Sequence, residues 1–213
     1  MRGPDAGLQT SLFGTAEPAV RAGAATERIA LDAKSWVDAT RDWLVGADTL
    51  LERLIAAVPW HQGRRRMWGR WVDDPRLSHW ARLGEAPPDP VIATLARRLE
   101  ATYGQRLRRP GYNFYRDGRD SVAWHADREL RTLDDTLVAI VTLGTRRPFL
   151  IRPIGGGSSI DLRPGSGDLI VMGGSAQLGW EHAVPKTARS GPRVSVSWRW
   201  TPGVPHATDL PDP

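Results

Sequence analysis

The spacing of hydrophobic residues divides this chain into an earlier part with helical periodicity and a later part with strand periodicity. In the earlier part, apolar residues recur every three or four positions in two stretches, 48–58 and 89–103, which predicts two amphipathic helices. Asp48 and Asp89 are predicted to cap these helices, and Pro59 and Gly104 to end them. The positions expected on the buried faces are Leu50, Leu51, Leu54, Ile55 and Val58 in the first helix, and Val91, Ile92, Leu95 and Leu99 in the second.

From residue 111 onward, short runs rich in β-branched and aromatic residues alternate with turns that contain glycine or proline. Many short strands separated by turn signals are typical of a β-sandwich or barrel. The last run alternates strictly, which predicts that Arg193, Ser195, Ser197 and Arg199 share one face of a strand. The predicted strands are 111–115, 136–144, 148–154, 158–162, 168–172, 180–184 and 193–200.

Length and composition indicate one domain with short tails. The chain has 213 residues, of which 40% are hydrophobic, enough for one core. We interpret residues 1–28 as a flexible tail, 29–205 as the folded domain and 206–213 as a C-terminal tail. The chain has no cysteine, no apolar run of about 18 residues and no signal peptide at its start, so we expect a cytoplasmic protein of the bacterial cytosol or nucleoid.

The N-terminal tail contains one short apolar segment, QTSLF, which runs from Gln9 to Phe13. It resembles the pentapeptide by which bacterial proteins dock on the replication sliding clamp. A clamp contact is therefore one expectation, and a chance match to so short a motif is the alternative. We expect the protein itself to be a monomer.

The charge of +5 favours a polyanionic partner such as DNA or RNA, although a coding bias toward arginine would have the same effect. Segment 64–80 interleaves five arginines, including Arg66, with Trp68, Trp71 and Trp80. Arginine with neighbouring aromatics suits phosphate contact combined with base stacking. The alternative is a hairpin that packs its tryptophans on the body of the protein.

Three side chains have the character of a metal site. His125 and Asp127 lie two residues apart, and in an extended segment they would point to the same side. His182 lies on a later predicted strand. Two histidines and one carboxylate on a β-scaffold are typical of non-haem Fe(II) oxygenases, and they leave coordination positions open. A hydrogen-bonded surface pair is the alternative for His125 and Asp127.

The predicted polar face of the last strand carries Arg193 and Arg199. Buried inside a small barrel, these cations would need an anion, and the planar guanidinium suits a carboxylate. A dicarboxylate cosubstrate meets that requirement. Ordinary surface arginines on a solvent-facing strand are the alternative.

A set of motifs in a defined order strengthens this interpretation. They are N-x-Y at 113–115, H-x-D-x-E at 125–129, LGTRRPF at 143–149, SGDLIVM at 166–172, W-x-H-x-V-P-K at 180–186 and R-x-S-x-x-x-R at 193–199. In this order and spacing the sequence resembles the AlkB-like 2-oxoglutarate- and Fe(II)-dependent dioxygenases from roughly residue 60 to residue 200. The resemblance implies a mainly β fold with flanking helices, in which a double-stranded β-helix (jelly-roll) core carries N-terminal helices and a substrate-recognition lid.

The resemblance also implies roles for individual residues. His125, Asp127 and His182 would bind Fe(II). For 2-oxoglutarate, Arg193 and Tyr115 would bind the distal carboxylate, and Arg199 and Asn113 would steady the end that chelates iron, with Ser195 assisting between the two arginines. Glu129 would approach the flipped base, or would be an ordinary solvated carboxylate. Candidates for the remaining substrate contacts are Trp68, Trp71, Arg66 and Trp180, of which Trp180 is as readily a residue that fills the barrel.

The activity implied is oxidative demethylation. The family uses Fe(II), O2 and 2-oxoglutarate to remove N-alkyl groups from damaged DNA bases, with RNA as a further substrate, and releases succinate, CO2 and formaldehyde. Two alternatives stay open: a hydroxylase with the same cofactors acting on a protein or a small molecule, and a non-catalytic nucleic-acid-binding module. Alkylated DNA, expected in single-stranded form, is the partner that a basic, aromatic lid favours.

Overall fold

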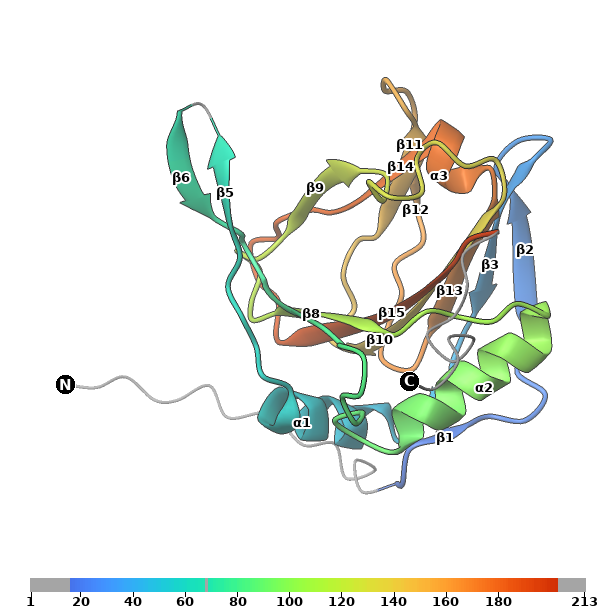
Figure 1. Ribbon diagram of the computed structural model, residues 1–213, viewed down its shortest axis with the longest axis vertical. Coiled ribbons are helices and arrows are strands. Elements are labelled where there is room, and N and C mark those ends of the chain that lie inside the picture. The colour runs from blue at the N-terminus through green and yellow to red at the C-terminus, as the bar shows by residue number, and fades with distance from the viewer. Residues whose placement is uncertain (1–15, 68, 203–213) are drawn as a thin grey trace, which may run out of the picture.

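The computed structural model describes residues 16–67 and 69–202, and it shows two β-sheets with helices against one of them (Figure 1). The larger sheet has seven strands in the order β2-β3-β13-β10-β15-β8-β7, and the smaller has four in the order β12-β11-β14-β9. The large-sheet strands are β2 (Thr26–Ala30), β3 (Ser35–Thr40), β7 (Leu77–Trp80), β8 (Gly111–Tyr115), β10 (Thr136–Gly144), β13 (Leu169–Gly174) and β15 (Arg193–Trp200). The small-sheet strands are β9 (Val122–His125), β11 (Leu150–Pro153), β12 (Ile160–Asp161) and β14 (Trp180–Val184).

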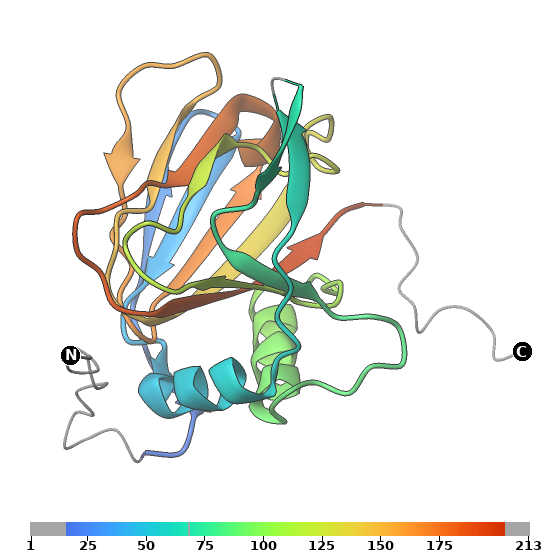
Figure 2. The same ribbon diagram turned by 90° about the vertical axis from the view of Figure 1, so that its left-hand side faces the viewer.

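Two further pairs of strands and three helices complete the described chain. Strand β1 (Ala19–Val20) pairs with β4 (Leu44–Val45), and β5 (Arg64–Met67) pairs with β6 (Arg70–Asp73). Helices α1 (Ala47–Ala57) and α2 (Val91–Tyr103) pack against the outer face of the large sheet, whereas α3 (Ala176–Gly179) joins β13 to β14 (Figure 2). None of the described helices has the length and apolar character needed to cross a membrane.

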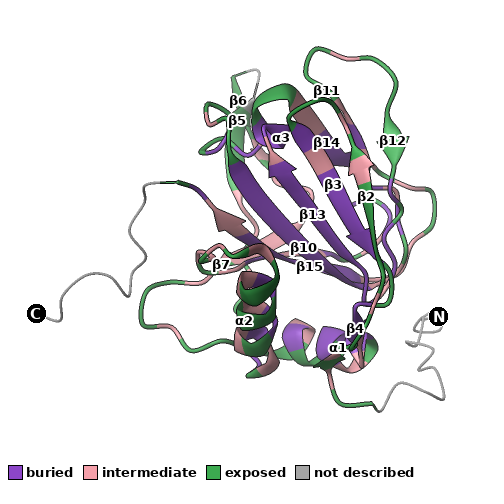
Figure 3. Cartoon of the chain, turned by 90° about the vertical axis from the view of Figure 1, so that its right-hand side faces the viewer, coloured by how far each residue is buried: buried purple, intermediate pink, exposed green. Residues whose placement is uncertain are grey.

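Strand β10 separates two hydrophobic cores, which explains its continuous apolar run from Leu137 to Val141. Residues Leu137, Ala139 and Val141 belong to the core beneath the helices. Val138 and Ile140 alternate with them and belong to the core between the two sheets. A strand that is buried on both faces needs apolar residues at every position, and the burial colours of Figure 3 show this for the middle of the large sheet.

The predicted jelly-roll class is confirmed, as are all seven predicted strands and both helices. At the start of α2, the backbone N–H of Val91 donates to Asp89 Oδ1 over 2.9 Å, and Gly104 ends the helix at φ 69°. The predicted cap of α1 is wrong: Gly46 takes that position in a left-handed conformation, and Asp48 instead accepts a hydrogen bond from Ser166 Oγ.

The tail expected over residues 1–28 includes part of the folded protein. Strand β1 and the beginning of β2 lie within it, and β2 pairs antiparallel with β3 along the edge of the large sheet. Segment TERIA has few apolar residues because this edge strand is mostly exposed, so periodicity did not reveal it. The pentapeptide at 9–13 lies outside the described residues.

Candidate active site

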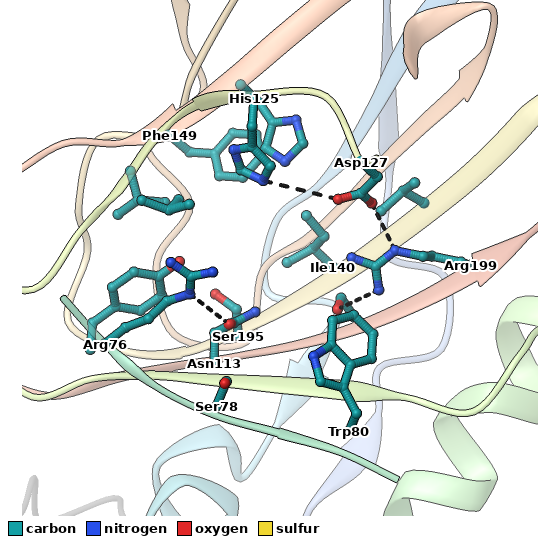
Figure 4. A pocket seen from close by; sticks show the side chains of 16 residues that line it. Arg76, Ser78, Trp80, Asn113, His125, Asp127, Ile140, Phe149, Ser195 and Arg199 are labelled. Atoms are coloured by element: carbon teal, nitrogen blue, oxygen red, sulfur yellow. Dashed lines mark hydrogen bonds and ion pairs between the residues drawn. The ribbon is translucent and has the colours of Figure 1, made fainter. Parts of the chain in front are cut away.

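A cavity opens between the two sheets, and the residues with predicted chemistry gather in it (Figure 4). Its lining comes from β7 and β8, from β9 and β14 opposite them, and from β10 and β15. Polar side chains reach it because β15 alternates: Ser195, Ser197 and Arg199 face the cavity, while Val194 and Val196 pack in the core beneath the helices. The strict alternation predicted for this strand is therefore confirmed.

His125, Asp127 and His182 form one group with the geometry of a metal site. His182 of β14 pairs in register with His125, the last residue of β9, and Asp127 follows two residues later. One ligand atom from each residue lies within 4.8 Å of the others. The Nδ1–H of His125 donates to the carbonyl of Ala123 over 2.8 Å, which leaves the lone pair of Nε2 for a metal.

The electrostatics of this group keep His182 and Asp127 in their metal-binding forms. Burial, and then the nearby His125, lower the pKa of His182 to about 3, so its imidazole is neutral. Burial opposes ionisation of Asp127, but the charge of Arg199 and its hydrogen bond overcome it and lower the pKa of that carboxyl. A neutral imidazole and an ionised carboxylate are the species that ligate a cation.

Asp127 is held by two contacts that leave its other oxygen free. Arg199 Nε donates to Oδ2 over 2.7 Å, and the backbone N–H of Asp127 donates to Gln177 Oε1 over 2.8 Å. The second oxygen, Oδ1, lies 4.0 Å from His125 Nε2. Gln177, in α3, is a supporting residue that sequence patterns did not reveal, because only the fold brings this helix beside the turn after β9.

Arg193 is a buried cation with unused hydrogen-bonding capacity. It is 0% exposed, and its Nη2 donates to Thr142 Oγ1 over 3.3 Å. Its Nε and Nη1 have no hydrogen-bond partner. Burial lowers its pKa to about 10. A buried guanidinium with two unpaired donors is costly unless an anion completes it, so this position fits the distal carboxylate of 2-oxoglutarate.

The remaining cosubstrate candidates surround Arg193. Tyr115 pairs in register with Arg193, and its neighbour Asn113 pairs with Ser195 on one side and with Ser78 on the other. Tyr115, Asn113 and Ser195 all line the cavity. The structure thus brings Tyr115, Asn113 and Ser195 together beside Arg193, which is not itself among the residues that line the cavity. Arg199, the fifth residue assigned to 2-oxoglutarate, lines the cavity further along β15 and contacts Asp127.

Two further arginines lie at or near the site, and Arg76 was expected with the phosphate-binding arginines of segment 64–80. Arg76 Nε donates to Asn113 Oδ1 over 2.9 Å, and its buried Nη1 has no partner, so it belongs to the cavity and not to the exposed lid. Arg147 is 1% exposed and donates to the carbonyls of Asp117, Asp120 and Pro185. It lies 5.4 Å from the Tyr115 ring centroid, on the side of the cavity where Arg193 lies.

The predicted substrate residues are distributed around the cavity. Glu129 stands at the rim with its side chain 56% exposed, 3.7 Å from Arg199. Arg66 and Trp71 are exposed on the β5–β6 hairpin, which projects from the body in Figure 1, and Trp68 is not among the described residues. The turn of this hairpin lies between the two arginine-bearing strands.

Trp180 is not among the residues that line the cavity; it packs against the core between the two sheets, which is the alternative expected for it. Its indole N–H donates to Asp32 Oδ2 over 2.6 Å, which directs the ring toward the β2–β3 turn. The strand does place it on the same face as His182, but two residues further toward the end of the sheet, opposite Pro153. Trp80, whose side chain is 51% exposed, lines the cavity instead.

Comparison with known proteins places this cavity in a known domain type. Residues 111–199 match the model of the 2OG-Fe(II) oxygenase superfamily, and they include both histidines, the aspartate and both arginines described above. The chain carries a 2OG-Fe(II) oxygenase domain. Oxygenases of this superfamily use Fe(II), 2-oxoglutarate and O2, and the residues of the cavity fit these groups.

The 2OG-Fe(II) oxygenase domain also has curated relatives. The chain is homologous to the alpha-ketoglutarate-dependent dioxygenase alkB homolog 3 of Rattus norvegicus, with 33% identity over 78% of this chain and 61% of that one. It is 25% identical to the DNA oxidative demethylase ALKBH2 of Homo sapiens over 72% of this chain and 68% of that one. The chain thus spans less than two thirds of the alkB homolog 3 proteins it matches.

Solved structures support the fold. A prolyl hydroxylase of Trichoplax adhaerens superimposes with a TM-score of 0.57 and 10% identity, covering 77% of this chain and 82% of that one. At this identity the likeness concerns the oxygenase fold alone.

Proposed function

We propose that this protein is an oxidative demethylase that removes N-alkyl groups from damaged bases in DNA, and also in RNA, with Fe(II), O2 and 2-oxoglutarate. The observation that carries the proposal is Arg193. Its guanidinium is fully buried with two unpaired donor atoms, against Tyr115, which lines the cavity that contains three metal-ligand side chains. A binding module would have no use for a buried cation that lacks an anion.

His125, Asp127 and His182 would hold the metal through Nε2 of His125, Oδ1 of Asp127 and the imidazole of His182. Three protein ligands leave positions open for the cosubstrate and O2. Iron bound there would supply the oxidation of 2-oxoglutarate to succinate and CO2, coupled to hydroxylation of the N-alkyl carbon. The hydroxylated methyl then leaves as formaldehyde, with the proton returning to the base nitrogen.

For the cosubstrate, Arg193 would receive the distal carboxylate, because its buried charge has no anion and its Nε and Nη1 have no hydrogen-bond partner. Tyr115 and Ser195 would add hydroxyl contacts along the same wall. Asn113 and Arg199 would bound the end nearest the metal group. Val138, Ile140 and Val184 line the cavity between these polar groups and would exclude water from the bound cosubstrate.

For the substrate, the exposed β5–β6 hairpin would meet the nucleic acid. Arg66 suits phosphate contact, and Trp71, which is 63% exposed, suits stacking on a base. Glu129 would accept a hydrogen bond from an exocyclic amino group of the flipped base at the rim. Trp68 is proposed for the same surface. The relatives include a DNA oxidative demethylase, which supports a nucleic-acid substrate.

The test is an anaerobic Fe(II) and 2-oxoglutarate titration, followed by exposure to O2 with a methylated single-stranded oligonucleotide. We expect loss of one methyl mass from the base with an equal amount of formaldehyde. Succinate without demethylation would contradict the substrate assignment and favour a protein or small-molecule hydroxylase. Neither product, with iron bound, would contradict the enzymatic function altogether.

We also propose that Gln9–Phe13 docks a monomeric protein on the sliding clamp in the bacterial cytosol. A peptide of residues 1–20 should bind a purified clamp, and replacement of Leu12 and Phe13 by alanine should abolish binding. Sedimentation of the full chain as a dimer would contradict the monomer.

A further inference from the structure

Trp80 lies directly on the backbone of Gly111. Trp80 is the last residue of β7 and pairs in register with Gly111, the first residue of β8. A Cβ built on Gly111 would lie 2.5 Å from Trp80 Cζ3, so the ring occupies the space that any other side chain would need. On its other side Gly111 pairs with Ser197, and the indole therefore extends over β8 toward β15.

On β15 the indole meets the guanidinium of Arg199. The Arg199 Cζ lies 4.5 Å from the centroid of the Trp80 ring, within the range of a cation–π contact. The same guanidinium donates from Nε to Asp127 Oδ2 over 2.7 Å, and the Arg199 side chain is only 11% exposed. Figure 4 shows this line of contacts, from Trp80 through Arg199 to Asp127.

The other contacts of Arg199 are weaker constraints on its position. Ser197 Oγ accepts from Nη1 at 3.4 Å, and Glu129 approaches Nε at 3.7 Å from a side chain that is 56% exposed. Neither contact limits the plane of the guanidinium. A flat ring at 4.5 Å does limit it, because rotation about the Cγ–Cδ or Cδ–Nε bond would drive the planar guanidinium into the indole.

We propose that Trp80 is a positioning residue of the metal site. Lying on Gly111, its indole holds the Arg199 guanidinium in the plane in which Nε engages Oδ2 of Asp127, so that Oδ1 faces the two histidines. The inference rests on the metal binding proposed above and not on the nucleic-acid substrate. According to this inference, Trp80, an exposed aromatic residue that lines the cavity, affects the affinity of the site for metal.

The experiment measures Mn(II) binding to the full chain by calorimetry, with and without 2-oxoglutarate. For Trp80→Ala we expect the Mn(II) dissociation constant to rise about tenfold, which corresponds to about 1.4 kcal/mol. Trp80→Phe keeps an aromatic face and should retain most of the affinity. Gly111→Ala leaves Trp80 in place but displaces its ring, and it should resemble Trp80→Ala.

Two control variants test whether substitutions elsewhere on the surface also weaken Mn(II) binding. Leu83→Ala removes an exposed apolar side chain in the loop after β7, and Gly179→Ala adds a Cβ where nothing lies within 4 Å. Both should bind Mn(II) as the unmodified chain does. Circular dichroism checks that every variant is folded. If Trp80→Ala does not fold, the comparison of Trp80→Phe with Gly111→Ala still tests the inference.

The outcomes separate this inference from the proposed function. If the unmodified chain does not bind Mn(II), the metal site itself is wrong and the inference falls with it. If it binds and Trp80→Ala and Gly111→Ala bind equally well, the positioning role is overturned. If Trp80→Ala raises only the KM for the oligonucleotide, the indole serves the substrate, and the inference is overturned as well.

Discussion

Arg193 and Tyr115 face each other across β15 and β8, with the guanidinium carbon 5.8 Å from the centroid of the phenol ring. The arginine is completely buried and keeps two donors without partners. Burial also raises the pKa of the Tyr115 hydroxyl, so that it is protonated and able to donate. A carboxylate bound between Arg193 and Tyr115 would neutralise the charge and accept hydrogen bonds from both side chains. Substitution of Arg193 therefore tests cosubstrate binding directly.

Replacing Arg193 by methionine should separate stability from cosubstrate binding. The buried charge has no carboxylate partner among the described residues, so its removal should raise the free energy of unfolding without cosubstrate by about 1–3 kcal/mol. The same change should raise the KM for 2-oxoglutarate by about a hundredfold, because a charge-assisted pair of hydrogen bonds is lost. Thermal unfolding with and without 2-oxoglutarate would show both effects. Arg53→Met, at a partly exposed ion pair, is the control, and a fall in stability for Arg193→Met would contradict the argument.

Removing the metal or one of its ligands should abolish turnover while leaving the fold intact. Asp127→Asn keeps the shape of the side chain but loses its negative charge, and metal affinity should fall by more than about a hundredfold. The thermal midpoint of the unmodified chain should rise when Fe(II) or Mn(II) is added and return when a chelator is added. The Asp127→Asn variant should show neither shift. A normal metal-dependent shift in this variant would exclude Asp127 as a ligand.

Arg147 should be a residue on which stability depends strongly. It donates to three backbone carbonyls that come from the loop after β8 and from the end of β14. Arg147→Met leaves these acceptors unpaired in a buried place, and we expect a loss of about 3 kcal/mol or more. Urea unfolding measures it. Arg146→Met, at an exposed neighbouring position, should cost less than about 1 kcal/mol.

The β5–β6 hairpin should affect binding of the nucleic acid but not binding of 2-oxoglutarate. Trp71→Ala and Arg66→Ala should raise the KM for a methylated oligonucleotide about tenfold, because a stacking contact or a phosphate contact is lost. The dependence on 2-oxoglutarate should not change, since none of the described side chains of the β5–β6 hairpin lines the cavity. For Arg66→Ala, the dependence of KM on salt should also become shallower. A changed affinity for 2-oxoglutarate would contradict this separation.

The two tryptophans near the site show where prediction from sequence reached its limit. Trp180 shares a strand face with His182, yet its indole turns to Asp32 in a loop that is distant in sequence. Trp80 was expected with the other tryptophans of segment 64–80, to stack on a base or to pack on the body, yet it lines the cavity because β7 pairs with β8 at a glycine. In both cases a segment distant in sequence decides where the ring lies. The spacing of hydrophobic residues does not say which segment that is.

The sequence by itself determined the two long helices, seven of the strands and the chemistry of the side chains, but it did not reveal the mostly exposed β2. Alternation along 193–200, the two helical faces and the ordered histidine, aspartate and arginine positions all follow from local periodicity and residue type. Only the tertiary structure decided which groups meet: His125 with His182 across two strands, Arg199 with Asp127, and Trp80 on Gly111. The physical reason is that strand order and register, which depend on contacts between distant segments, set these distances, whereas a periodic pattern records only which way each side chain faces.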